Sequence, residues 1–222
     1  MKKLYDLTHL IDPERTVRKF SVKMIGADEV NPNVVRLDNQ WYIMHEISMV
    51  NHLGTHIETP YHLFKDRPDL GSISADHYCG PGILISLKGI PAKSAISKEQ
   101  VSRAAEKAGG IKKGDIAFFN LGYSGSYGTD TYADSPYFSN EAIRWIVDQG
   151  IKVMGVDAGG VEIPASEEHV NHAALFTKNV LLIENLANLD SIPVNRFMVY
   201  AFPLFIKGMD SFPLRVVVEA EV

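Results

Sequence analysis

Three histidines and a carboxylate lie within one short stretch of the sequence, which runs from Asn51 to His62 and reads NHLGTHIETPYH. The donors are His52, His56, Glu58 and His62. Imidazole nitrogens and carboxylate oxygens are ligands that zinc and similar divalent ions accept, and unpaired polar groups are costly to bury. One histidine alone is more often a hydrogen-bonded residue than a ligand. Four donors this close together predict a metal or catalytic site.

The backbone between the first two histidines must curl if they share an ion. In an extended chain His52 and His56 would lie roughly 13 Å apart, whereas zinc binds imidazole nitrogen at about 2.0–2.1 Å. Gly54 is able to adopt a positive φ at little cost. Alternatively, one helical turn brings positions i and i+4 to about 6 Å, and Pro60 then returns Thr59 to an extended form. Both conformations gather the donors.

The composition is that of an ordinary globular protein. The chain has 222 residues, 45% of them hydrophobic and 22% charged, so we expect one domain spanning 1–222. The net charge of −5 offers no basic surface for nucleic acid. The first residues, MKKLYDLTHLIDPERT, are interrupted by Asp6, Thr8 and His9, which argues against a signal peptide or membrane span and favours a cytoplasmic location. The single cysteine, Cys79, excludes an intrachain disulfide, and its HYCGPG context predicts a loop or packed thiol without a catalytic role.

Hydrophobic patterns predict strands alternating with two amphipathic helices. One helix begins after Ser97, with a capping box completed by Gln100, and the other begins after Ser139. The strand, helix, strand order that ends at Asp157 is typical of an α/β sheet. Strands are expected at Leu4–Ile11, Trp41–Val50, Ile83–Lys88, Asp115–Leu121, Lys152–Asp157, Val180–Leu186, Phe197–Leu204 and Arg215–Val222.

The sequence allows two alternative roles for the segment Asp12–Asn39 and two for the residue Asp157. Residues Asp12 to Asn39 carry Pro13, Pro32 and scattered charge without a sustained period, which predicts an irregular excursion. It is equally compatible with a lid and with an arm that contacts a partner. Asp157 follows a predicted strand, where it either lines the site or makes a turn before the next glycines.

A second group of donors lies far along the chain. Glu184 stands within the apolar run VLLIENL, where an acid needs a partner or a metal, and His172 precedes it by 12 residues. With these residues and the NHLGTHIETPYH stretch, the sequence resembles the cyclase family that includes bacterial kynurenine formamidases and isatin hydrolases. The resemblance extends from LYDLTH through GVDAG, which contains Asp157, to FPLFIKGMDSFPLRV.

The resemblance implies a fold and a set of roles. The family has an α/β fold, a swivelling β/β/α arrangement with a mixed sheet and packed helices, and is usually a homodimer. By the resemblance, His62 is the acid/base, and one or two divalent ions, zinc first and manganese second, bind the remaining donors. Those ligands would be His52, His56, Glu58, His172 and Glu184.

Position 58 departs from the family pattern, which has aspartate there. Glu58 is one methylene longer, so it either reaches the same ion, chelates differently or favours a single ion. The Gly- and Tyr-rich loop after Leu121 also departs from the family's Thr-Gly-Trp, which makes the substrate harder to carry over than the chemistry.

The function predicted is metal-dependent hydrolysis of a small aryl formamide or cyclic amide. Free imidazole titrates near 6.5, so a histidine such as His62 suits transfer of the water proton to the leaving amine. The Gly-x-Ser-x-Gly elbow of α/β-hydrolases is absent, which disfavours a serine nucleophile. The alternatives are a metal-dependent cyclase or dehydratase, and a member of the fold that binds a metal or ligand without turnover.

Overall fold

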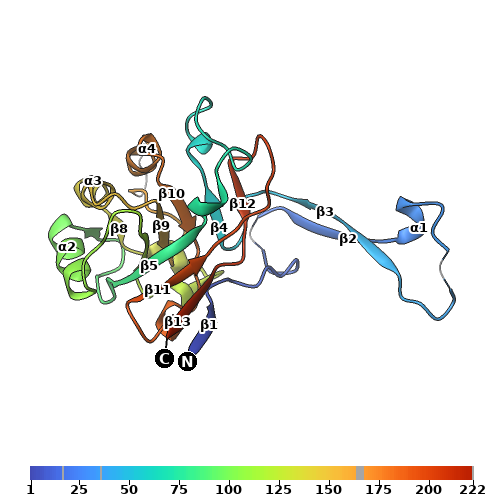
Figure 1. Ribbon diagram of the computed structural model, residues 1–222, viewed down its shortest axis with the longest axis horizontal. Helices are drawn as coiled ribbons and strands as arrows, with labels where there is room; N and C mark the ends of the chain where they lie inside the picture. Colours follow the sequence, from blue (N-terminus) through green and yellow to red (C-terminus); the bar gives the residue numbers. More distant parts are fainter. Residues whose placement is uncertain (17, 36, 164–167, 222) are drawn as a thin grey trace.

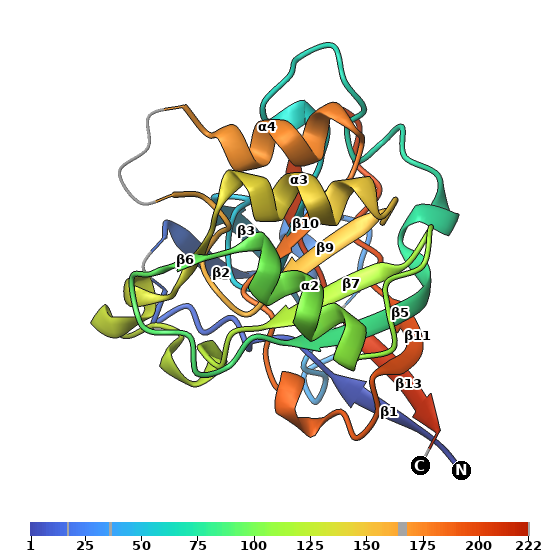
Figure 2. The same ribbon diagram turned by 90° about the vertical axis from the view of Figure 1, so that its left-hand side faces the viewer.

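A mixed β-sheet with helices on one face forms the body of the molecule (Figures 1 and 2). The computed structural model describes residues 1–16, 18–35, 37–163 and 168–221. The strands are β1 (Lys2–Asp6), β2 (Phe20–Gly26), β3 (Ile43–Met49), β4 (His56–Glu58), β5 (Cys79–Ser86), β6 (Ala95–Ile96), β7 (Ile116–Asn120), β8 (Tyr137–Phe138), β9 (Val153–Val156), β10 (Leu181–Glu184), β11 (Arg196–Tyr200), β12 (Ser211–Pro213) and β13 (Val217–Glu221). The α-helices are α1 (Ala27–Val30), α2 (Lys98–Lys107), α3 (Asn140–Asp148) and α4 (Val170–Thr177).

Within the described ranges, the main sheet has nine strands in the order β1-β13-β11-β5-β7-β9-β10-β4-β12. The central pairs β5–β7, β7–β9 and β9–β10 are parallel, and the outer pairs are antiparallel. Parallel neighbours need crossover connections, and α2, α3 and α4 cover one face of the sheet (Figure 2). The core between them includes Ile83, Phe119, Ile143 and Phe176, each with no exposed surface.

The opposite face of the sheet curls around a second core. Ile57 on β4 and Val218 on β13, from opposite ends of the strand order, belong to the same buried cluster. Leu7 joins the chain before β13 to the chain after β10. Its N–H donates to Val216 O at 2.8 Å, and its carbonyl oxygen accepts from Ala187 N at 2.9 Å. The curl therefore brings the short strand β4 to the end of β10, where the polar residues gather.

The α/β fold predicted from the sequence is confirmed, and so are both helix starts. Ser97 Oγ accepts from Gln100 N, and Gln100 Oε1 accepts from Ser97 N, which completes the capping box. Ser139 Oγ accepts from Ala142 N at the start of α3. Each side-chain cap satisfies a backbone N–H that a helix start leaves without an intrahelical partner.

The prediction of an irregular excursion over Asp12–Asn39 is wrong for residues 20–30 and holds for the other described residues of that segment. The segment contains β2 and α1, and β2 pairs in register with β3 to form an antiparallel hairpin, here called the arm, that projects from the body (Figure 1). The sequence does contain the alternating pattern of a strand here, because the apolar residues Phe20, Val22 and Met24 alternate with the polar residues Ser21 and Lys23.

Two exclusions made from the sequence concern the thiol and the membrane. Cys79 is the first residue of β5 rather than a loop residue, and its Sγ lies 3.8 Å from Ala75 O, as a packed thiol does.

Among the described residues, no helix is both long and apolar enough to cross a membrane.

Candidate metal centre

Strand β4 carries the first donors of the site. His56 and Glu58 are two residues apart on a strand, so their side chains point to the same side. Antiparallel pairing places His56 opposite Glu184 on β10 and Glu58 opposite Ser211 on β12. The cluster predicted from the sequence is thus built on strands that hold its members in register.

The curl before β4 comes from Gly54 and not from a helical turn. Gly54 has φ +61°, a conformation that residues with a Cβ rarely adopt. Its carbonyl oxygen accepts from Asn185 Nδ2 at 2.8 Å, and Thr55 Oγ1 donates to the Asn185 carbonyl oxygen at 2.5 Å. These bonds fix the turn that brings His52 back towards His56, with their ring centroids 5.1 Å apart.

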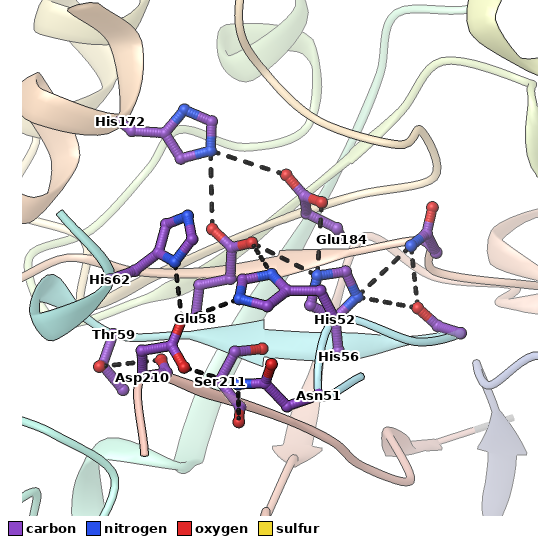
Figure 3. A network of polar contacts seen from close by, with 12 residues as sticks. Asn51, His52, His56, Glu58, Thr59, His62, His172, Glu184, Asp210 and Ser211 are labelled. Carbon is purple, nitrogen blue, oxygen red and sulfur yellow. Dashed lines mark hydrogen bonds and ion pairs between the residues drawn. The ribbon is translucent and has the colours of Figure 1, made fainter. Parts of the chain in front are cut away.

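Glu58 lies at the centre of the donors and is almost fully buried (Figure 3). Its Oε1 is 2.8 Å from His52 Nδ1 and 3.3 Å from His56 Nε2, whereas its Oε2 is 3.5 Å from His172 Nε2. Glu184 closes the group, since its Oε2 is 3.5 Å from His56 Nε2 and its Oε1 is 3.8 Å from His172 Nε2. The structure therefore brings together the five residues predicted as ligands.

Each of the three predicted histidine ligands has its second nitrogen tied to an outer acceptor. His52 Nε2 lies 2.8 Å from Asp210 Oδ2, and His172 Nδ1 lies 2.7 Å from Glu162 Oε2. His56 Nδ1 lies 2.9 Å from Gly54 O. Since these acceptors take one N–H of each ring, the nitrogens that face Glu58 and Glu184 offer a lone pair to a cation once they have lost their own proton. Outer hydrogen bonds of this kind are the usual support of metal-binding histidines.

The carboxylates hold protons on the neighbouring imidazoles. Burial disfavours the charged form of His52, but hydrogen bonds to Asp210 and Glu58 outweigh it and raise the pKa of His52 to about 9. Burial likewise opposes charge on His172, and its bonds to Glu162 and Glu184 raise its pKa to about 10. Against the effect of burial, the same histidines keep the pKa of Glu58 well below its usual range.

The donor set fits a divalent cation. Two groups of possible ligand atoms, each within 4.8 Å, share Glu58: one contains His52 and His56, the other His172 and Glu184. Glu58 Oε2 is buried and makes no hydrogen bond with the described residues, although an ionised oxygen in the interior needs a partner. A carboxylate that faces one donor group with each oxygen is suited to bridging two ions.

His62 stands at the open side of this cluster. It lies in the short 3₁₀ turn Pro60–His62, and its side chain is 37% exposed. Its ring centroid is 4.5 Å from that of His52 and 6.3 Å from that of His172, and its Nδ1 lies 2.7 Å from Asp210 Oδ2. This location gives His62 access to both the cluster and solvent.

Sequence reasoning missed the acceptors Asp210 and Glu162 and the turn-fixing amide of Asn185. Each meets its partner through the fold and not through a recognisable local motif. The available signals were weak: Asp210 stands in the FIKGMDSFPLRV motif, and Asn185 directly follows Glu184.

The chain bends at Asp157 before the following glycines, and the carboxylate of Asp157 serves the loop after β7 and not the donor cluster. Its Oδ1 accepts from Leu121 N at 2.7 Å, and its Oδ2 accepts from Gly122 N, Tyr123 N and Ser124 N at 3.0, 2.9 and 3.3 Å. It therefore holds the start of the Gly- and Tyr-rich loop that follows β7.

The fold and this site define an α/β protein with a buried histidine and carboxylate centre at the end of a curled sheet. The model of the Cyclase family, described as "Putative cyclase", matches residues 5–163. The chain belongs to the Cyclase family. The family resemblance seen in the sequence is thereby confirmed.

Similar proteins place the chain within this family. Kynurenine formamidase of Erythrobacter litoralis is 25% identical over 166 residues, which cover 74% of this chain and 71% of that protein. Isatin hydrolase A from Ralstonia solanacearum has the same fold, with a TM-score of 0.84 at 20% identity over 99% of this chain and 92% of its own. A predicted metal-dependent hydrolase from Bacillus stearothermophilus gives a TM-score of 0.76 at 26% identity, with full coverage of both chains.

Proposed function

We propose that this chain is a metal-dependent hydrolase that cleaves the amide bond of a small aryl formamide or cyclic amide. The observation that carries the proposal is the position of Glu58, whose two carboxylate oxygens face two different groups of donors. The kynurenine formamidase and metal-dependent hydrolase relatives support the same class of reaction.

We assign the ligands of the proposed ions to the residues that surround Glu58. Imidazole and carboxylate donors suit zinc or manganese, and the bridging position of Glu58 favours two ions. The chemistry supplied by such ions is polarisation of an amide carbonyl and activation of water near neutral pH. The assigned ligands are His52, His56, Glu58, His172 and Glu184.

His62 is the proposed acid/base. It borders the donor cluster, and its partial exposure allows proton exchange with solvent. An imidazole there is able to accept a proton from the attacking water and to deliver it to the leaving amine, a role that typically contributes about 10²–10⁴-fold in rate.

Metal removal tests the proposed class of function. The protein is dialysed against a chelator and assayed with an N-formyl arylamine and with isatin, before and after addition of zinc or manganese. We expect turnover and thermal stability to fall on removal and to return with the ion, because an ion bound only by the folded state stabilises that state. Full activity in verified metal-free protein refutes the mechanism, and metal binding without turnover of either substrate indicates a non-catalytic member.

The assignment of His62 is tested separately from that of the ligands. His62→Ala is expected to keep its metal content and to lose about 10²–10⁴-fold in kcat, whereas His52→Ala is expected to lose metal. If His62→Ala empties the site in elemental analysis, His62 is a ligand and not the acid/base.

We also propose a homodimer that forms through the arm. The cross-strand pair Val22 and Ile47 is 40% and 59% exposed, and neighbouring Met24 is 55% exposed. A two-stranded hairpin standing alone is marginally stable in water and needs packing against an apolar surface. The matching apolar face on the arm of a second copy of the chain is a surface of this kind.

Light scattering over micromolar concentrations checks the dimer. Ile47→Lys is expected to shift the protein towards the monomer, because it places a charge in the apolar face of the arm. Leu4→Lys, on edge strand β1 and 63% exposed, is the control that keeps the dimer. A wild-type monomer at all concentrations contradicts the proposal, and dissociation by Leu4→Lys instead locates the interface at β1.

A further inference from the structure

The carboxylate of Asp210 joins the proposed acid/base to one of the proposed ligands (Figure 3). Asp210 directly precedes β12, whose pairing with β4 places Ser211 opposite Glu58. We propose that Asp210 is a positioning residue that sets the orientation and the proton-bearing nitrogen of both His62 and His52. The inference rests on the proposed function and deepens it.

Asp210 is itself held by the segment that carries the histidines. Thr59 N and Thr59 Oγ1 both donate to the Asp210 carbonyl oxygen, at 2.8 and 3.0 Å. Asn51 Nδ2 donates to Asp210 Oδ1 at 2.6 Å and to Ser211 O at 3.1 Å. Backbone and side chain are thus fixed from two directions, which leaves Oδ2 in a set position.

That oxygen faces two imidazoles. Asp210 Oδ2 lies 2.7 Å from His62 Nδ1 and 2.8 Å from His52 Nε2. An ionised carboxylate only accepts hydrogen bonds, so both nitrogens that face it carry hydrogen. His62 then keeps its Nε2 lone pair for the proton transfer, and His52 presents Nδ1, the nitrogen that lies 2.8 Å from Glu58 Oε1, to an ion.

A carboxylate that orients a catalytic imidazole acts through geometry and tautomer. In other enzymes, loss of such a carboxylate costs up to about 10⁴-fold in kcat, and loss of an outer partner of a metal ligand costs about 10–100-fold. The competing interpretation is that His52, His62 and Asp210 form a metal site of their own, since their ligand atoms lie within 4.8 Å of one another. The two interpretations predict different metal contents.

The kinetic test uses Asp210→Asn, which keeps the shape and removes the charge. We expect the metal content of the parent at saturating zinc, a zinc affinity lower by up to about 10–100-fold, a nearly unchanged KM and a fall in kcat of about 10² or more. We also expect the change to add little in a His62→Ala background, because residues that act as a unit are non-additive. Asp148→Asn at the exposed end of α3 is the control with the same charge loss, and all its parameters should match those of the parent.

Several results overturn the inference. Loss of a whole equivalent of metal in Asp210→Asn that saturating zinc does not restore shows that Asp210 is itself a ligand. A further kcat loss of the same size in the His62→Ala background, with metal retained, shows that Asp210 does not act through His62. A parent-like kcat in Asp210→Asn refutes any role in positioning.

A second readout separates failure of this inference from failure of the proposed function. ¹⁵N NMR of the zinc-loaded protein distinguishes the two tautomers of each histidine, whether or not a substrate is turned over. The inference requires hydrogen on Nδ1 of neutral His62 in the parent, and a change in tautomer population in Asp210→Asn. Hydrogen on Nε2 of His62 in the parent overturns it.

Discussion

Loading zinc into the metal-free protein should release protons in an amount set by the carboxylates. The raised pKa values of about 9 for His52 and about 10 for His172 mean that both imidazoles are charged at pH 8. Each must lose one proton to become a ligand, and against the effect of burial the pKa of His56 is raised as well by Glu58 and Glu184, so at least two protons are expected to leave at pH 8. Histidines with an ordinary pKa near 6.5 would already be neutral at that pH and would release almost none.

The sign of the pH dependence follows from these raised values. A group with a raised pKa keeps its proton at any pH below that pKa, so His52 and His172 together release about two protons from pH 7 to about 8, and their release falls towards zero above pH 10. By linkage, zinc affinity rises at least about 100-fold between pH 7 and pH 8. Isothermal titration calorimetry in buffers with different ionisation enthalpies measures the proton count directly.

A matched variant isolates one of the two histidines. Burial lowers the pKa of His172, and the bond to Glu162 is the largest effect that raises it. Glu162→Gln should therefore reduce the release at pH 8 by about one proton, while Asp148→Asn leaves it unchanged. Because water at the ion is able to contribute one proton, release of one or fewer at pH 8, or an unchanged count in Glu162→Gln, refutes this reasoning.

Three further changes test the construction of the site. Glu58→Asp shortens the central carboxylate and should weaken metal binding by about 10–100-fold in a competition assay. If the number of bound ions and the rate both rise instead, the glutamate of the parent prevents binding of a second ion. Gly54→Ala should destabilise the fold by about 1–2 kcal/mol in urea titrations, because φ is +61° and a Cβ would lie 3.0 Å from Ile11 Cγ1; a neutral effect would argue that the turn relaxes freely. Asp157→Asn should cost about 2–4 kcal/mol, because an amide cannot accept all four backbone N–H groups; equal midpoints for parent and variant would contradict that role.

Much of the donor cluster could be predicted from the sequence, because three of its members are close together in the chain. His52, His56 and Glu58 lie within seven positions, and Gly54 marks the turn that joins them. Both helix starts were equally visible, since a capping serine and its partner are three residues apart. Whether residues 1–222 form one domain and lie in the cytoplasm stays a prediction.

The missed parts depend on long-range pairing or on short elements. Asp210 meets His62 across 148 positions, and only the pairing of β12 with β4 brings them together. Helix α4, which carries His172, has eight residues and little amphipathic pattern, so its period did not stand out. Strand β2 was missed because Pro13 and Pro32, which lie on either side of it, suggested an irregular segment despite its alternating pattern.

The pairing of β4 with both β10 and β12 has a consequence for the order of assembly. Strand β4 leaves the ribosome early, but its neighbours Leu181–Glu184 and Ser211–Pro213 are made more than a hundred residues later. During synthesis His52 and His56 therefore remain without Glu184 and Asp210. The chain must lose the conformational entropy of closing a long loop before those contacts form. A nascent chain halted before Leu181 would hold His52, His56 and Glu58 without Glu184, so the donor set of the proposed metal site is completed only late in biosynthesis.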